Sequence, residues 1–196
     1  MSILGIIASS RLVAPAVGDF ESIATVTVGS GGAADVEFTS IPATYTHLQI
    51  RGIGRSTASG NYRQGVSMRV NSDSGSNYSF HRLWGTGAIV AAGGLASQTL
   101  MNQVAFVTDS SGLANSFGTT VIDILDYANT NKYKTLRSLT GFDNNTTGGT
   151  GEQGGVLFLS DAWYDTSAIT SISLFPESSG NFAEYSTYAL YGIKAA

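Results

Sequence analysis

Apolar and polar residues alternate with a period of two along most of this chain. Ala24, Val26 and Val28 are separated by threonines, and Leu48 and Ile50 are separated by polar neighbours. This alternation predicts strands with one buried face and one solvated face. Clusters of Gly, Ser and Asn interrupt the runs, as turns do in antiparallel all-β domains.

Eleven segments have a strand pattern, and we expect strands near 24–28, 36–38, 48–50, 66–70, 78–84, 100–107, 119–127, 135–142, 156–163, 169–175 and 185–193. With no helical periodicity, this number predicts an all-β fold, an antiparallel two-sheet β-sandwich that is jelly-roll-like. The glycine-rich stretch Gly29–Gly32 predicts a hairpin loop. The residues predicted to be buried are Ile50, Val66, Met68, Val104, Phe106, Phe158, Ile172 and Leu174.

The first twenty residues differ from the rest of the chain. Their apolar start contains Ile3, Leu4, Ile6 and Ile7, and Arg11 and Pro15 follow. Residues 1–20 are therefore predicted to form a short N-terminal arm or an edge strand, with both alternatives open. Residues 21–196 are predicted to form a single β-sandwich domain.

Composition supports strands and argues against several functions. Ser, Thr, Asn and Gly make up 79 of the 196 residues, and only 12% of residues are charged, against about 25% in average proteins. A helical bundle is excluded, because it would need the surface Glu, Lys and Arg that are scarce here. A net charge of −4 without a basic run argues against nucleic-acid and membrane binding. The chain contains no cysteine, which excludes disulfides and thiolate metal sites.

The apolar run at residues 3–8 is too short for a membrane helix, which needs about 20 residues. It also lacks the positive residues that precede the core of a signal peptide. We therefore expect synthesis in the cytoplasm of the producing cell without a secretion signal.

Two glycine- or Asn-rich motifs favour loops over ligand sites. Residues 149–154 fit the pattern G-x-G-x-x-G, but a strand pattern follows, where a nucleotide site requires a helix. The sequence Asp143-Asn-Asn145 resembles the start of a calcium loop and lacks its glycine and closing glutamate. We expect both segments to be loops, with no metal or cofactor.

Ionisable residues do not form a recognisable catalytic pattern. His47 and His81 lie singly on predicted strands, where we expect them on the polar face. The close carboxylate pairs, Asp123 with Asp126 and Asp161 with Asp165, have spacings that do not place them together on a strand. The sequence therefore predicts no catalytic residues.

Arginine and aromatic residues concentrate between positions 51 and 84. Such mixtures bind proteins through guanidinium and ring contacts, or stack on sugars, and the negative net charge favours protein contact. The interface candidates are Ile3, Leu4, Ile6, Ile7, Arg51, Arg55, Tyr62, Arg63 and Trp84.

Four stretches together, residues 20–28, 38–51, 121–132 and 188–194, resemble a group of short virion proteins of tailed bacteriophages. The last stretch, Tyr-Ala-Leu-Tyr-Gly-Ile-Lys, is the most specific. The resemblance implies a β-sandwich, a non-enzymatic structural role in the virion, homotrimers, and contacts with other virion proteins, either the major capsid protein or tail proteins.

Three hypotheses follow. The first is a capsid decoration or cement protein that oligomerises and clamps neighbouring shell subunits, with the apolar arm docking on a neighbour. The second is a tail-associated receptor-binding or fibre-tip protein whose loop 143–155 and Arg/aromatic residues contact host glycans. The third and least favoured is a depolymerase that uses an unrecognised carboxylate pair.

Overall fold

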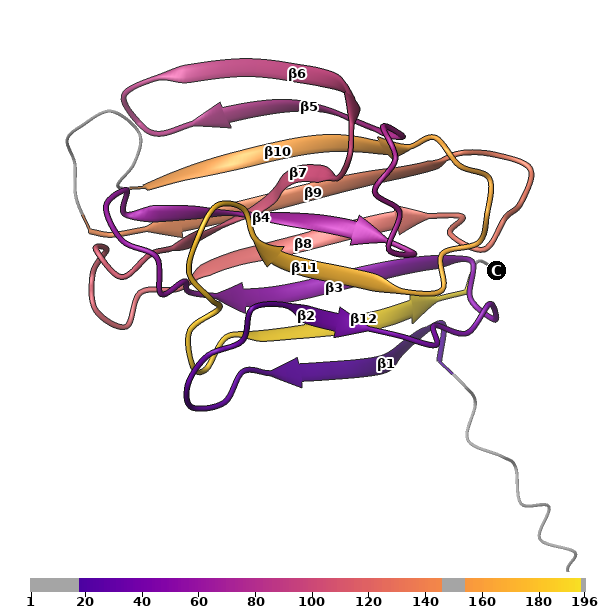
Figure 1. Cartoon of the computed structure of the whole chain (residues 1–196), viewed down its shortest axis with the longest axis horizontal. Coiled ribbons are helices and arrows are strands. Elements are labelled where there is room, and N and C mark those ends of the chain that lie inside the picture. Colours follow the sequence, from indigo (N-terminus) through magenta and orange to yellow (C-terminus); the bar gives the residue numbers. More distant parts are fainter. Residues whose placement is uncertain (1–17, 146–153, 195–196) are drawn as a thin grey trace, which may run out of the picture.

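Strands with one apolar face need a second apolar surface to cover them, and here a second sheet provides it. The computed structural model describes residues 18–145 and 154–194. It contains two antiparallel sheets packed face to face (Figure 1). The all-β sandwich prediction is confirmed.

The large sheet has eight strands, in the spatial order β1 (Phe20–Thr27), β12 (Thr187–Ile193), β3 (His47–Gly54), β8 (Gly118–Leu125), β9 (Lys134–Asp143), β10 (Gly154–Trp163), β5 (Tyr78–Gly85) and β6 (Val90–Gln98). The small sheet has four, in the order β2 (Val36–Phe38), β11 (Ile172–Pro176), β4 (Arg63–Val70) and β7 (Met101–Thr108). In Figure 1, β1 and β6 lie at the opposite edges of the large sheet.

Each of the eleven predicted segments overlaps a strand, and β6 is the strand that the sequence pattern missed. The division into eight and four strands also differs from a jelly roll, which has eight strands in two sheets. The large sheet is consequently wider than the small one, and most residues of β6 are exposed.

The core lies between the two sheets. Alternate residues of β8, β9 and β10 face it, whereas β4 and β7 of the small sheet have runs of consecutive buried residues. Seven of the eight residues predicted to be buried are at most 1% exposed: Ile50, Val66, Met68, Val104, Phe106, Ile172 and Leu174. The indole of Trp163 is also buried, and its Nε1 donates a hydrogen bond of 2.7 Å to Asp73 Oδ2.

The prediction for Phe158 was wrong. Its side chain is 47% exposed on the outer face of the large sheet, whereas Leu157 and Leu159 point into the core. Val156–Leu159 is a continuous apolar run, so a period of two does not say which parity faces inward.

This corrected orientation of β10 predicts unequal effects of two alanine substitutions. Leu159→Ala should cost about 2–5 kcal/mol of unfolding free energy, because it leaves a cavity in the core. Phe158→Ala, on the surface, should cost about 1 kcal/mol or less. Denaturant unfolding of both variants measures the difference, and a larger loss for Phe158→Ala would contradict the orientation.

The hairpin predicted at Gly29–Gly32 is also wrong. The turn itself is present, with positive φ at Gly31 and Gly32. However, β1 belongs to the large sheet and β2 to the small one. The turn therefore carries the chain from one sheet to the other.

Lys134, at the start of β9, is fully buried. Its ammonium donates hydrogen bonds to three backbone carbonyls, those of Asn129 at 2.7 Å, Lys132 at 2.9 Å and Thr166 at 3.0 Å. Burial lowers the pKa of this lysine. The side chain ties the β8–β9 connection to the segment that follows β10.

The N-terminal residues 1–17 lie outside the described residues, and so do Ile3, Leu4, Ile6 and Ile7 of the predicted interface. Phe20 begins β1, which is an edge strand of the large sheet.

Candidate interaction surface

An exposed apolar row crosses the outer face of the large sheet. Antiparallel register aligns Val121 of β8 with Leu139 of β9, Leu139 with Phe158 of β10, and Phe158 with Leu83 of β5. The side chains of Leu139, Phe158 and Leu83 are about half exposed, at 53%, 47% and 52%. We call Val121, Leu139, Phe158 and Leu83 the apolar row.

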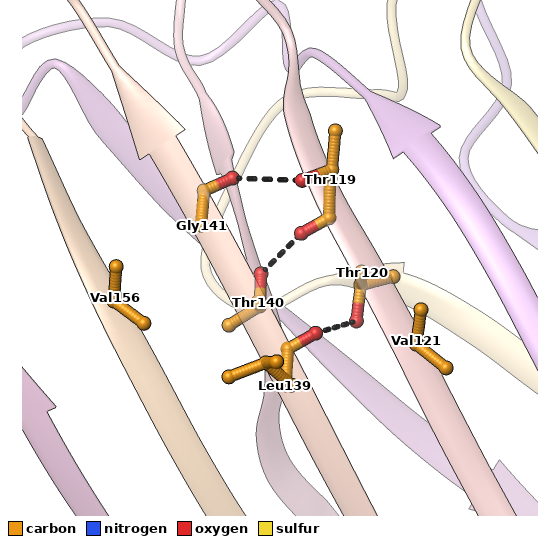
Figure 2. Close-up of a pocket in the computed structure, with 7 residues that line it drawn as sticks. All are labelled: Thr119, Thr120, Val121, Leu139, Thr140, Gly141 and Val156. Carbon is orange, nitrogen blue, oxygen red and sulfur yellow. Dashed lines mark hydrogen bonds between the residues drawn. The ribbon is translucent and has the colours of Figure 1, made fainter.

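A second line of apolar or small residues runs beside this row. Val156, 58% exposed, is aligned with Gly141, which is aligned with Thr119. Figure 2 shows Val156, Leu139 and Val121 on three neighbouring strands around a depression of about 290 Å³. The solvated face of an antiparallel sheet is normally polar. Part of this face instead carries a contiguous apolar patch of the kind that binds other proteins.

A polar row borders the apolar row on its other side. Gln49 Nε2 donates to Asp123 Oδ1 at 2.7 Å, and Arg137 Nη2 donates to Asp123 Oδ2 at 3.1 Å. The carboxylate is therefore already paired with a guanidinium on the same face. A partner that covers this face would bury a compensated charge, which avoids much of the cost of burying an isolated one.

Arg51 extends this face towards the β1 edge. Its guanidinium lies over the rings of Phe20, at 5.2 Å, and Tyr191, at 5.7 Å, and those two rings stack with centroids 4.8 Å apart. Arg51 is exposed. Arg51 is thus a predicted interface residue that the structure places on the outer face of the large sheet.

The structure places Arg55 and Tyr62 elsewhere. The guanidinium of Arg55 donates to the carbonyls of Gly112, Leu113 and Ser116, and so fixes the loop between β7 and β8. Tyr62 has a positive φ and a partly exposed ring. Its carbonyl accepts a 3.1 Å hydrogen bond from Asn144 Nδ2.

Arg63 and Trp84 do come together, but between the sheets. The guanidinium of Arg63 lies over the rings of Trp84, at 5.1 Å, and Phe106, at 4.6 Å. Trp84 packs against the buried cluster that contains Phe106 and Leu157. The arginine and aromatic residues that are close in sequence therefore form separate groups rather than one exposed platform.

The two loop motifs have structural roles where they are described. Asn144 is buried; its Oδ1 accepts from the backbone of Leu113 at 3.0 Å and its Nδ2 donates to Tyr62. Gly154 begins β10, so a strand follows the glycine pattern. Residues 146–153 lie outside the described residues. Within residues 18–145 and 154–194, no group of three or more His, Asp or Glu could hold a metal ion.

The histidines and carboxylate pairs do not converge. His47 and His81 lie on the outer-face side of β3 and β5, as predicted, and His47 Nδ1 accepts a hydrogen bond from the backbone of Asp126. Asp123 and Asp126 have different partners, Arg137 for the first and Lys132 with His47 for the second. Asp165 lies in the loop after β10.

Asp161 points into the core from β10 and is 1% exposed. Neither carboxylate oxygen has a hydrogen-bond partner within the described ranges. This burial raises the pKa of Asp161 to about 8. Burial therefore favours the protonated, uncharged form of this side chain.

Sequence reasoning missed the apolar row because its members come from four strands. Each is an exposed apolar residue that looks individually like a core position. The signal that was available is that 119–127, 135–142 and 156–163 carry apolar residues of both parities. A strand that is apolar on both faces can be covered on one face by the core, and its other face is then available to a binding partner.

Residues 18–145 and 154–194 contain no helix with the length and hydropathy needed to span a bilayer.

No protein-family model matches the chain, and no curated protein matches it.

Proposed function

We propose that this chain is a non-enzymatic structural protein of a tailed-bacteriophage virion, a capsid decoration or cement protein that oligomerises and binds neighbouring shell subunits. The observation that carries the proposal is the apolar row on the outer face of the large sheet. The resemblance to short phage virion proteins supports a place for this chain in the virion. A scarcity of charge across the chain suits a surface that other protein covers.

The binding face is the outer face of the large sheet. Burial of apolar area drives association there, at roughly 25 cal/mol per Å² before entropic costs. The Gln49–Asp123–Arg137 row gives the contact its orientation, because polar groups at the rim of an interface must meet matching partners. Tail attachment through host glycans receives less support, since Trp84 packs inward and does not offer an exposed ring for stacking.

The test places a charge in the apolar row. Leu139→Asp should lower binding to particles prepared without this protein by about tenfold or more, because complex formation would bury an unpaired carboxylate. Leu113→Asp is the matched control: Leu113 is 52% exposed, as Leu139 is at 53%, but lies in the loop after β7. Co-sedimentation with the particles measures binding.

Both variants should unfold at temperatures close to that of the wild type, since both substitutions are at exposed positions. Equal particle occupancy by Leu139→Asp, Leu113→Asp and the wild type would contradict the proposed binding face. Binding to purified tails and not to heads would contradict the decoration role and favour the tail alternative.

A further inference from the structure

Strand β6 forms an unprotected edge of the large sheet. Among the described residues it pairs only with β5, and its nine residues, Val90–Gln98, include no charge and no proline. Edge strands usually carry charged residues or proline. These residues hinder other strands from pairing with the exposed backbone N–H and C=O groups of the edge. At the opposite edge, β1 has Glu21, which binds Lys194 and Tyr45, and a bulge between Ser22 and Ala24.

The regular part of this edge is apolar on both of its faces. Val90–Leu95 pairs residue by residue with β5, and the register shifts only beyond Leu95. Val90 is 79% exposed and Leu95 55% exposed. Val90 is aligned with Gly85 on the outer face, whereas Leu95 is aligned with Phe80, which points inward. A strand added here would meet apolar side chains on either side.

The N-terminal segment, which we call the arm in this proposal, has a sequence that matches this edge. Residues 3–8, Ile-Leu-Gly-Ile-Ile-Ala, are apolar at both parities, the pattern of a strand covered on both faces. They are six residues, as many as the regular part of β6. β-Branched isoleucine favours the extended conformation.

Residues 3–8 of the same molecule could reach this edge only with the intervening residues almost fully extended. β1 and β6 are separated by seven strand spacings, and a strand added outside β6 would lie one spacing further, about 38 Å from β1. Between residue 8 and Phe20 there are eleven residues, which span at most about 36–40 Å when fully extended. They would have to run taut and straight across a face of the sheet. An arm from a neighbouring molecule has no such constraint.

We propose that residues 3–8 of one copy add as a strand to the β6 edge of a second copy. Backbone hydrogen bonds would provide affinity, and Val90 and Leu95 would pack against the isoleucines. Such a contact joins two different surfaces, so it closes into a ring when the rotation allows, in keeping with the homotrimer that the resemblance implies. The inference rests on the proposed assembly role but uses a different surface from the apolar row.

The absence of cysteine permits a direct test by disulfide cross-linking. Ile6→Cys and Ile7→Cys place a thiol on either face of the added strand, and Ala92→Cys places one on the exposed β6. Mixing an arm variant with Ala92→Cys under mild oxidation should give a cross-linked heterodimer. The yield should exceed collisional background by at least about tenfold, because docking raises the local thiol concentration to the millimolar range.

Thr25→Cys is the matched control, since Thr25 is exposed on β1 at the other edge of the same sheet. The proposal is overturned if arm variants cross-link equally to Thr25→Cys, or if no mixture cross-links. Dimers formed as readily by Ala92→Cys alone would instead show pairing of two β6 edges. A closed monomer as the main product of the Ile6→Cys/Ala92→Cys double variant would show that the arm folds back on its own molecule.

Deletion of residues 2–12 provides a second readout on the isolated protein. The deleted protein should keep its melting temperature and sediment as a smaller species than the wild type. An unchanged oligomer would contradict the arm contact, whatever the outcome for particle binding by Leu139→Asp. The two proposals can therefore fail separately.

Discussion

Replacing Asp161 with asparagine should remove most of the pH dependence of stability between about pH 4 and pH 8. In the folded protein burial raises the pKa of Asp161 to about 8, whereas an unfolded aspartate has a pKa of about 3.9. Between these values the folded state holds one proton more than the unfolded state. The wild type therefore loses stability as pH rises through this window, by about 1.4 kcal/mol per pH unit and about 5 kcal/mol in all.

Denaturant unfolding at about pH 4, 6 and 8 measures this effect. The stability of Asp161→Asn should be closest to that of the wild type near pH 4, where the folded acid is protonated and the unfolded acid is about half protonated, and Asp161→Asn should be the more stable protein near pH 8. A wild-type stability that does not fall over this range would show that Asp161 is compensated in the folded protein.

Asp165→Asn is the control for this experiment. Hydrogen bonds from the backbone and side chain of Ser167 lower the pKa of Asp165. Its contribution to stability is therefore present above the unfolded pKa and is lost as pH falls through the folded pKa. Asp165→Asn should leave the decline between about pH 4 and pH 8 in place.

The second large effect concerns Lys134. Lys134→Met should lower the free energy of unfolding by about 3 kcal/mol or more, because three backbone carbonyls lose their buried donor together. Methionine keeps the length and the apolar stem of the side chain, so the loss reports the hydrogen bonds rather than a cavity.

Lys132→Met is the matched control. Lys132 is two residues away, its side chain is 54% exposed, and it pairs with Asp126. Surface ion pairs of this kind contribute about 1 kcal/mol or less. Denaturant unfolding compares the two variants, and equal losses would rule out the anchoring role of Lys134.

Most strands could be predicted because a period of two survives wherever one face is buried and the other is wet. β6 lacked this signal. Its residues Ala91–Gly94 are small on both faces, and little of the strand is buried. It is held by backbone pairing to β5 rather than by side-chain packing. Backbone pairing alone does not produce an alternation of apolar and polar residues.

The orientation of β10 shows a different limit. Its inward residues include Leu157, Leu159 and the ionisable Asp161, and its outward residues include Val156 and Phe158. Sequence reasoning places a carboxylate outside and a phenylalanine inside, because that arrangement has the lower desolvation cost. In the structure Trp163 is buried on the same face as Asp161 and donates a hydrogen bond to Asp73, a residue ninety positions away.

The candidate site was harder to predict than the fold because it depends on register. The apolar row needs three strand pairings to align one residue from each of four strands. The residue composition of each strand alone does not predict these alignments. Conversely, the arginines and aromatics between positions 51 and 84 are neighbours in sequence, but alternation along the strands sends Arg51 to the outer face and Trp84 to the interior.

The place of β12 in the large sheet has a consequence for how the protein is made. This strand, the last in chain order, lies between β1 and β3, the first and second strands of its sheet along the chain. Until Thr187–Ile193 has left the ribosome, β1 has no strand beside it and β3 keeps an open edge. Completion of the large sheet must therefore wait until β12 has been made. Pairing of such distant segments folds slowly and leaves strand edges available for aggregation in the meantime.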